Sequence, residues 1–203
     1  AFTMPFLVVN YHSVEPEDHY PYPGIHPISG DRLRRQIRAL RELFVFVSAD
    51  DVRSAVRGGL ALPKNACLLT FDDGLRSQWD NALPVLEEEG VSAMFFINGL
   101  PIAEEKVLTV HKVQWSRAHT PPEAFLDLVR TQYRALTGKY FDKEPVTISE
   151  EELKKHFPYD PDLVQARIKY ILGRNLLETS LREALIQAIF MEHISNEANF
   201  CEQ

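Results

Sequence analysis

Two adjacent carboxylates, Asp72 and Asp73, follow an apolar run and precede a glycine in the segment LLTFDDG, which begins at Leu68. Like charges this close disfavour each other's ionised form. A bound cation removes the conflict, because one carboxylate can ligate the metal while the other acts as a base on water. The pair therefore predicts metal-assisted hydrolysis. The alternative interpretation is an ordinary turn rich in Asp and Gly.

The position of the pair in its local pattern favours the chemical interpretation. Residues 66–71 have the apolar character of a buried strand, and Gly74 permits the chain to bend directly after the two carboxylates. In parallel α/β folds and barrels, active sites lie at the carboxyl ends of the strands. His12 follows another such run, at residues 6–10, and is therefore expected at the same end of the sheet.

The first half of the chain alternates short strands with helices, which predicts a mostly parallel α/β sheet or barrel. A helix from Ser29 has Leu33, Ile37 and Leu40 at helical spacing. Its arginines predict a solvated face, and the alternative is contact with an anionic polymer. We expect strands at residues 6–10, 43–47, 66–71 and 92–97 and helices from residue 29, at 49–57 and ending at Gly90.

The second half reads as a helical module. Thr120–Glu123 and Ser149–Glu152 have the capping-box pattern, and the first of these helices is expected to end at Gly138. Further helices are expected from Asp160-Pro161 to Gly173 and from Ser180 to about Glu192. We therefore divide the chain into an α/β region at residues 1–100 and an α-helical module at 101–203.

Composition excludes several classes of protein. The 203 residues carry a formal net charge of −7, so no nucleic acid partner is expected. Cys67 and Cys201 suggest neither a disulfide framework nor a metal knuckle, which fits a reduced compartment. The sequence shows no membrane span and no signal peptide, so a cytoplasmic location is the first expectation.

The motif TFDDG at Thr70–Gly74 resembles the first signature of the polysaccharide deacetylases, the NodB-homology group or carbohydrate esterase family 4. The segments NALPVL from Asn81 and GVSAMFFI from Gly90 are similar to the next helix and strand of that family. VNYHSV, from Val9, resembles a segment near the start of its circularly permuted members. The resemblance covers residues 6–97 and implies a partial (β/α) barrel followed by an α-helical insertion.

The resemblance implies roles for individual residues. Asp72 matches the general base, Asp73 a ligand of a Zn²⁺-like divalent metal, and His12 the general acid of permuted members. The implied reaction is metal-dependent removal of N- or O-acetyl groups from a sugar or polysaccharide. Tyr20, Tyr22 and His26, on the proline-rich loop after His12, are candidate substrate-binding residues that could stack on sugar rings.

The sequence also departs from the family. The expected His-Ser/Thr-x-x-His motif is missing, and a catalytic metal site needs about three protein ligands. His111 and His119 lie about 80° apart around a helix, so they do not form a ready chelate. Four predicted strands are fewer than the seven or eight of a closed barrel. We therefore expect an incomplete barrel, completed by further chain or by a second copy in a homodimer.

Two other functions remain open. One is a non-catalytic carbohydrate-binding or assembly domain that kept the fold without a complete metal site. The other is Mg²⁺-dependent phosphoryl transfer by the acidic pair, although the sequence has no Gly-rich phosphate loop.

Overall fold

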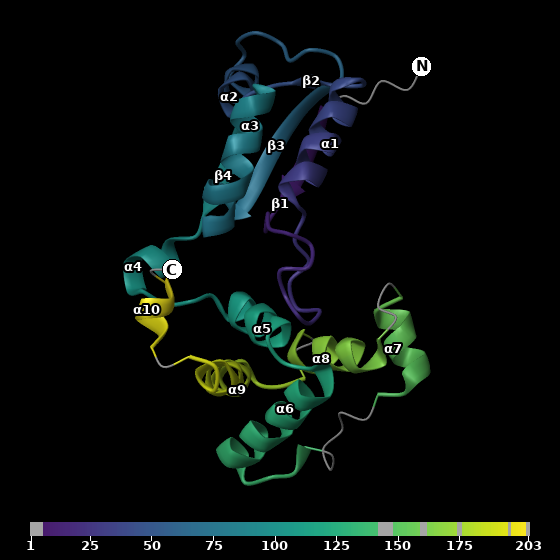
Figure 1. The fold of residues 1–203 in the computed structure, drawn as a ribbon, viewed down its shortest axis with the longest axis vertical. Coiled ribbons are helices and arrows are strands. Elements are labelled where there is room, and N and C mark those ends of the chain that lie inside the picture. The colour runs from purple at the N-terminus through teal and green to yellow at the C-terminus, as the bar shows by residue number, and fades with distance from the viewer. Residues whose placement is uncertain (1–5, 142–147, 159–161, 174–175, 195, 202–203) are drawn as a thin grey trace. The chain divides into compact units, whose positions relative to one another are not determined.

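The computed structural model describes residues 6–141, 148–158, 162–173, 176–194 and 196–201 (Figure 1). The chain divides into two compact units. The first comprises residues 1–19 and 26–99, and the second comprises residues 20–25 and 100–203. The sequence places residues 20–25 with the α/β region, whereas in the structure they belong to the helical unit.

The first unit is built on a parallel sheet around a central strand, β3. Its elements are β1 (Phe6–Tyr11), α1 (Gly30–Arg41), β2 (Val45–Phe46), α2 (Ala49–Val56), β3 (Ala66–Asp73), η1 (Gln78–Ala82), α3 (Leu83–Glu89) and β4 (Ala93–Ile97). Strand β3 pairs with β1 along one edge and with β2 and β4 along the other. All these pairings are parallel, so the predicted α/β class is confirmed.

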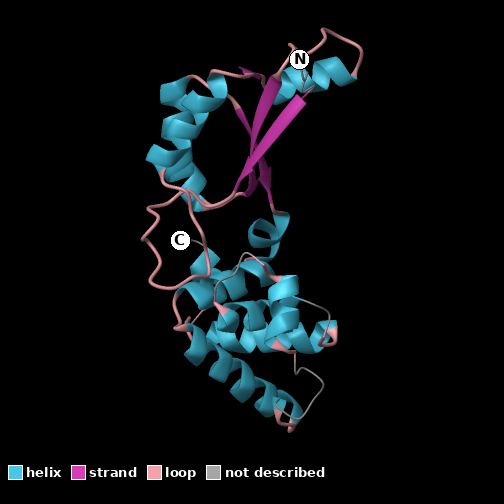
Figure 2. Cartoon of the chain, turned by 90° about the vertical axis from the view of Figure 1, so that its right-hand side faces the viewer, coloured by secondary structure: helices cyan, strands magenta, loops and turns pink. Residues whose placement is uncertain are grey.

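Helices α1 and α3 cover one face of this sheet, whereas the short helix α2 lies over only part of the other face, where Val8 and Phe96 are exposed (Figure 2). On one face, Cys67, Leu69 and Phe71 of β3 pack with α1, η1 and α3 in the main core cluster. On the other face, Ala66 and Leu68 pack with Val47, Val52 and Leu62. Parallel strands are long apolar runs because both faces are buried, which explains the pattern of β3.

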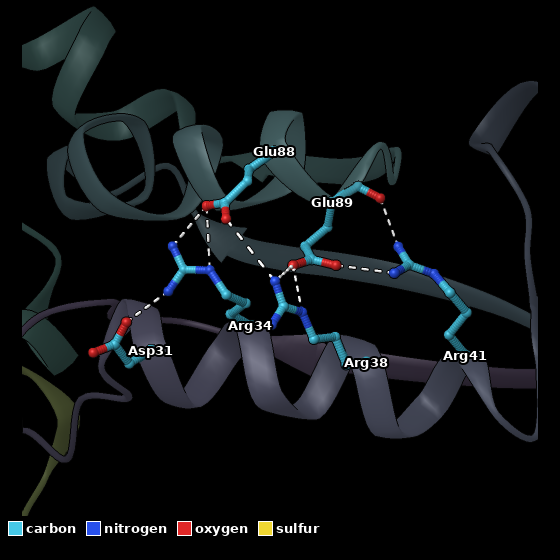
Figure 3. A network of polar contacts seen from close by, with 6 residues as sticks. All are labelled: Asp31, Arg34, Arg38, Arg41, Glu88 and Glu89. Carbon is cyan, nitrogen blue, oxygen red and sulfur yellow. Dashed lines mark hydrogen bonds and ion pairs between the residues drawn. The ribbon is translucent and has the colours of Figure 1, made fainter.

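The arginines of α1 are largely paired with α3, which modifies the prediction of a solvated face (Figure 3). Arg34 contacts Glu88 at 2.7 Å, and Arg38 and Arg41 contact Glu89 at 2.8 and 2.9 Å. The Glu89 side chain is only 5% exposed. Hydrogen bonds from Arg38 and then Arg41 hold the pKa of the Glu89 carboxyl below its ordinary value.

The helix after TFDDG begins with a π-turn, η1, which was not predicted. The N–H of Leu83 donates to the carbonyl of Gln78, five residues earlier. Pro84 has no N–H and its ring crowds the preceding turn, so a widened turn accommodates it. Trp79 of this turn is 69% exposed, whereas Ala82 and Leu86 are buried.

The second unit is helical in all the elements that the structure describes. These are α4 (Gly99–Glu104), α5 (Thr109–Ala118), α6 (Pro122–Thr137), α7 (Glu150–His156), α8 (Leu163–Gly173), α9 (Thr179–Met191) and α10 (Glu197–Cys201). Residues of α6, α8 and α9 form its main core cluster. The structure adds α4, α5 and α10 to the predicted helices.

The predicted helix starts of this unit had mixed outcomes. Ser149 forms the expected capping box, and Gly138 ends α6 in the left-handed region. The predicted box at Thr120 is wrong, since α6 starts after Pro121 without a side-chain cap and the Thr120 hydroxyl contacts Nε2 of His193. Helix α9 starts at Thr179, so Ser180 lies inside it. Asp160 and Pro161 lie outside the described residues.

Within the described ranges, no helix is both long and apolar enough to cross a membrane.

Candidate functional site

The candidate site lies where β1 and β3 end. The last register pair of these strands is Tyr11 with Phe71, and the next residue of each strand is His12 and Asp72. The two predicted catalytic residues are therefore at the same, carboxyl, end of two adjacent parallel strands. This is the location that the parallel α/β architecture favours for a site.

The structure brings the His12 and Asp72 side chains together. Nε2 of His12 lies 3.8 Å from Oδ2 of Asp72, and the two side chains are 57% and 39% exposed. At this distance the pair interacts as an ion pair when the imidazole is protonated. An exposed pair contributes at most about 1 kcal/mol to stability, so this contact adds little to the folding free energy.

A hydrogen-bond chain that sequence reasoning missed fixes the Asp72 carboxylate. The hydroxyl of Thr70 donates to Oδ1 of Asn10 at 2.9 Å, and Nδ2 of Asn10 donates to Oδ2 of Asp72 at 2.9 Å. Thr70 orients the Asn10 amide, and the amide in turn orients the carboxylate. The alternation of side chains along a strand could have indicated this chain of hydrogen bonds, because residues 70 and 72 share one face of β3. Asn10 lies beside Thr70 in the register of β1 and β3.

Asp73 ends β3 with a backbone angle that few side chains adopt. Its φ is 80°, and the following Gly74 has φ 67°. A Cβ on Gly74 would lie 3.1 Å from Cγ2 of Ile97, so both the angle and the space favour glycine. Left-handed conformation in a non-glycine residue costs about 1–2 kcal/mol, and such local strain is concentrated at functional sites.

The start of the following helical turn contacts the strand ends through three side chains. The Gln78 amide nitrogen donates to the carbonyls of His12 and Asp72, at 2.9 and 2.6 Å. The Ser77 hydroxyl accepts a hydrogen bond from the N–H of Val14 at 3.3 Å, and the Asn81 amide donates one to the carbonyl of Val14 at 2.7 Å. The sequence analysis assigned these residues no role in the site.

The predicted substrate-binding residues are divided between the two units. Tyr20 and Tyr22 belong to the helical unit, where the ring of Tyr20 packs edge-on against His119 and the N–H of Tyr22 donates to the carbonyl of Ala118. His26 is exposed and belongs to the first unit. Contact of these side chains with a sugar stays a prediction.

The Tyr20–Ile25 segment is held closely by α5. The Arg117 guanidinium donates to the carbonyl of Pro23 at 3.3 Å and also bonds to Oε1 of Gln165. A Cβ on Gly24 would overlap the backbone of Gln114 and Ala118. The segment is therefore an integral part of the packing of the helical unit.

The described residues do not make up a metal centre by themselves. Among them, no group of three or more His, Cys, Asp or Glu side chains is arranged to hold a metal ion. Catalytic zinc sites use about three protein ligands, so Asp73 and its described neighbours do not form such a set.

His119, which the sequence analysis considered as a ligand, packs in the helical unit, and so does His193. His119 caps α5 and stacks on Trp115, with ring centroids 4.0 Å apart. His193 lies edge-on to the same Trp115 ring, and burial, followed by the nearby His119, lowers its pKa. Trp115 thus brings these two histidines together through ring contacts.

The family model described as polysaccharide deacetylase matches residues 60–165, which is more than half of the chain. The chain belongs to the polysaccharide deacetylase family. The match includes TFDDG, and it therefore confirms the resemblance on which the roles of Asp72 and Asp73 were based. The individual roles stay predictions.

Known proteins similar to this family member are deacetylases. Poly-beta-1,6-N-acetyl-D-glucosamine N-deacetylases from two strains of Escherichia coli are each 36% identical over 83 residues. The match covers 40% of this chain and only 12% of each relative.

Three solved structures give weaker likenesses. A de-N-acetylase from Aggregatibacter actinomycetemcomitans has a TM-score of 0.38 and 28% identity, covering 44% of this chain and 36% of the other. IcaB from Ammonifex degensii has a TM-score of 0.39 and 30% identity, covering 46% and 38%. Streptococcus pyogenes deacetylase PplD, in complex with acetate, has a TM-score of 0.36 and 18% identity, covering 83% and 80%.

Proposed function

We propose that this chain is part of a hydrolase that removes acetyl groups from an amino-sugar polysaccharide, with Asp72 as general base and His12 as general acid. The observation that carries the proposal is the 3.8 Å approach of Nε2 of His12 to Oδ2 of Asp72 at paired strand ends. Family membership supports the reaction class. The name of the Escherichia coli relatives makes N-acetylglucosamine polymers the first substrate to test.

The proposed reaction needs two proton transfers. Water adds to the acyl carbon and loses a proton to Asp72, the C–N bond breaks, and protonated His12 donates a proton to the departing amine. The products are acetate and a free amino sugar. Because Asn10 donates to Oδ2 of Asp72, we assign the proton transfer to Oδ1. For an O-acetyl group, the same steps release an alcohol.

We further propose that the protein uses a divalent metal, with Asp73 as one ligand. Zn²⁺ is the first metal to test. A bound metal would supply Lewis-acid polarisation of the acyl carbonyl. The support is the family resemblance of the TFDDG motif together with the strained backbone of Asp73. Further ligands are required, because the described residues do not supply three.

The test compares Asp72→Asn, Asp73→Ala and the control Asp80→Asn in the natural gene product that contains this sequence. Asp80 is a suitable control because it is a partly exposed carboxylate of η1, paired with Arg76. Turnover is measured on a chromogenic acetyl ester and on N-acetylglucosamine oligomers, and bound metal is measured by elemental analysis. We expect Asp72→Asn to keep its metal and lose about 10²–10⁴-fold in kcat, and Asp73→Ala to lose its metal.

Several outcomes would contradict the proposal. Equal metal loss in both variants would refute the division of roles, and full turnover by Asp72→Asn would refute the general base. Sugar binding without turnover in the unchanged protein would favour the carbohydrate-binding or assembly alternative. Phosphoryl transfer that depends on Mg²⁺ would favour the other rival.

A further inference from the structure

The Gln78 side chain connects the two strand ends of the candidate site. It is 2% exposed, and its amide nitrogen donates to the carbonyls of both His12 and Asp72. One buried amide group therefore bonds the backbone of the proposed acid and the backbone of the proposed base, from a position outside both strands.

This connection lies where the sheet no longer joins the two strands. The ladder between β1 and β3 ends at the pair of Tyr11 and Phe71. Beyond this pair β3 stays in register only with β4, through Asp73 and Ile97, and Asp73 and Gly74 both have positive φ angles. At His12 and Asp72 the two hydrogen bonds from Gln78 replace the backbone hydrogen bonds that would continue the pairing of β1 with β3.

Donor chemistry explains why a glutamine occupies this position. Two carbonyl oxygens face the side chain, so it must supply two N–H groups, which a primary amide does. The reverse amide orientation would place an oxygen against both carbonyls. The observed orientation leaves Oε1 of Gln78 buried without a hydrogen-bond partner among the described residues, so the two N–H bonds determine how the amide lies.

We propose that Gln78 is a positioning residue that holds the His12 and Asp72 backbones at the spacing needed for their side chains to act together. The inference rests on the proposed function, since it assigns catalysis to those two residues. Gln78 itself bonds only their backbone carbonyls. Misplacement of reacting groups by about 1 Å can reduce a rate about 10²-fold, which sets the scale of the effect.

The test uses Gln78→Met, which keeps the length of the side chain without donors, and Gln78→Glu, which keeps its shape and places oxygen against the carbonyls. Asp80→Asn is again the control on the same turn. In folded protein, we expect kcat to fall about 10- to 100-fold in both Gln78 variants with KM changed less than about threefold. A purely structural role would lower the melting temperature and the folded fraction, and leave kcat per folded molecule unchanged.

A second measurement does not depend on activity. In protein labelled at histidine, the Cε1–H resonance of His12 is assigned by its loss in His12→Gln. We expect Asp72→Asn to change the chemical shift of this resonance. When Asp72→Asn is introduced into protein that already carries Gln78→Met, we expect a change no more than half as large. Gln78→Glu serves the same comparison if the methionine variant does not fold.

The two measurements separate the two ideas. A halved resonance response, in a protein whose turnover is unaffected by Asp72→Asn, would support positioning by Gln78 and refute the catalytic assignment. An unchanged response together with an unchanged kcat in the Gln78 variants would overturn the positioning role. Failure of both Gln78 variants to fold would also overturn it, because the residue would then be a requirement of the fold.

Discussion

Phe71 is the residue through which packing determines the register of the strands that carry the site. Its fully buried ring stacks on Tyr11 of β1 at 5.3 Å and on Phe95 of β4 at 5.0 Å between centroids. The three residues are register partners across the sheet. Phe71→Leu keeps an apolar side chain and removes both ring pairs.

The expected cost follows from these two contacts. Each aromatic pair contributes about 0.5–1.5 kcal/mol beyond the area that it buries, so the loss is about 1–3 kcal/mol. Phe125→Leu in α6 is the matched control, because Phe125 is equally buried and makes no ring pair with another described aromatic side chain. The general cost of exchanging Phe for Leu is common to the two variants, and the difference between them isolates the stacking.

Hydrogen-exchange mass spectrometry measures each unit separately. We expect β3 peptides to exchange faster in Phe71→Leu than in the unchanged protein, and α6 peptides to exchange faster in Phe125→Leu. The first increase in exchange rate should exceed the second about 5- to 160-fold, which is the equivalent of 1–3 kcal/mol. Equal changes in the two variants would refute the contribution of ring stacking to the stability of the sheet.

Two further predictions concern pH. The pKa of Glu89 is lower in the folded protein than its ordinary value of 4.5. The ionised carboxylate therefore stabilises the fold fully at pH values above 4.5, and this stabilisation is lost as the pH falls through the lowered pKa. Glu89→Gln should therefore show a smaller loss of urea midpoint on acidification than the control Glu87→Gln, and equal losses would contradict the pairing. Burial, followed by the charge of Cys67, raises the pKa of Tyr11 to about 12. The unfolded chain then ionises first, so stability should fall as the pH rises above 10, and a Tyr11→Phe variant whose urea midpoint falls as steeply would refute this.

The sequence was most informative where local patterns and burial agree. Ser29 accepts a hydrogen bond from the N–H of Arg32 at the start of α1, as expected for an N-cap. The apolar run before Asp72 forms the central strand, whose burial on both faces produces a continuous pattern. His12 and Asp72 meet because parallel strands end at a common edge, which needs only the order of the elements.

Features that depend on contacts distant in sequence were missed. The hydrogen bonds from Gln78 to His12 and from Asn10 to Asp72 join residues more than sixty positions apart, and no local pattern encodes them. Helix α5 was not predicted because its apolar residues do not gather on one side, and its buried face includes Lys112 and Arg117. Arg117 contacts Pro23 and Gln165, both far along the chain. All these contacts lie within one copy of the chain, so they do not test the predicted homodimer, which stays a prediction.

The Tyr20–Ile25 segment also has a consequence for biosynthesis. It emerges early, but Arg117, which bonds the carbonyl of Pro23, follows 94 residues later. At about 5–20 residues per second, translation reaches that arginine roughly 5–20 s after the proline. During this interval the nascent hexapeptide has no helix α5 to receive it. Residues 100–203 transplanted alone into another protein would likewise lack the backbone that fits beside Gln114 and Ala118, so the upstream six residues must accompany any graft of the helical unit.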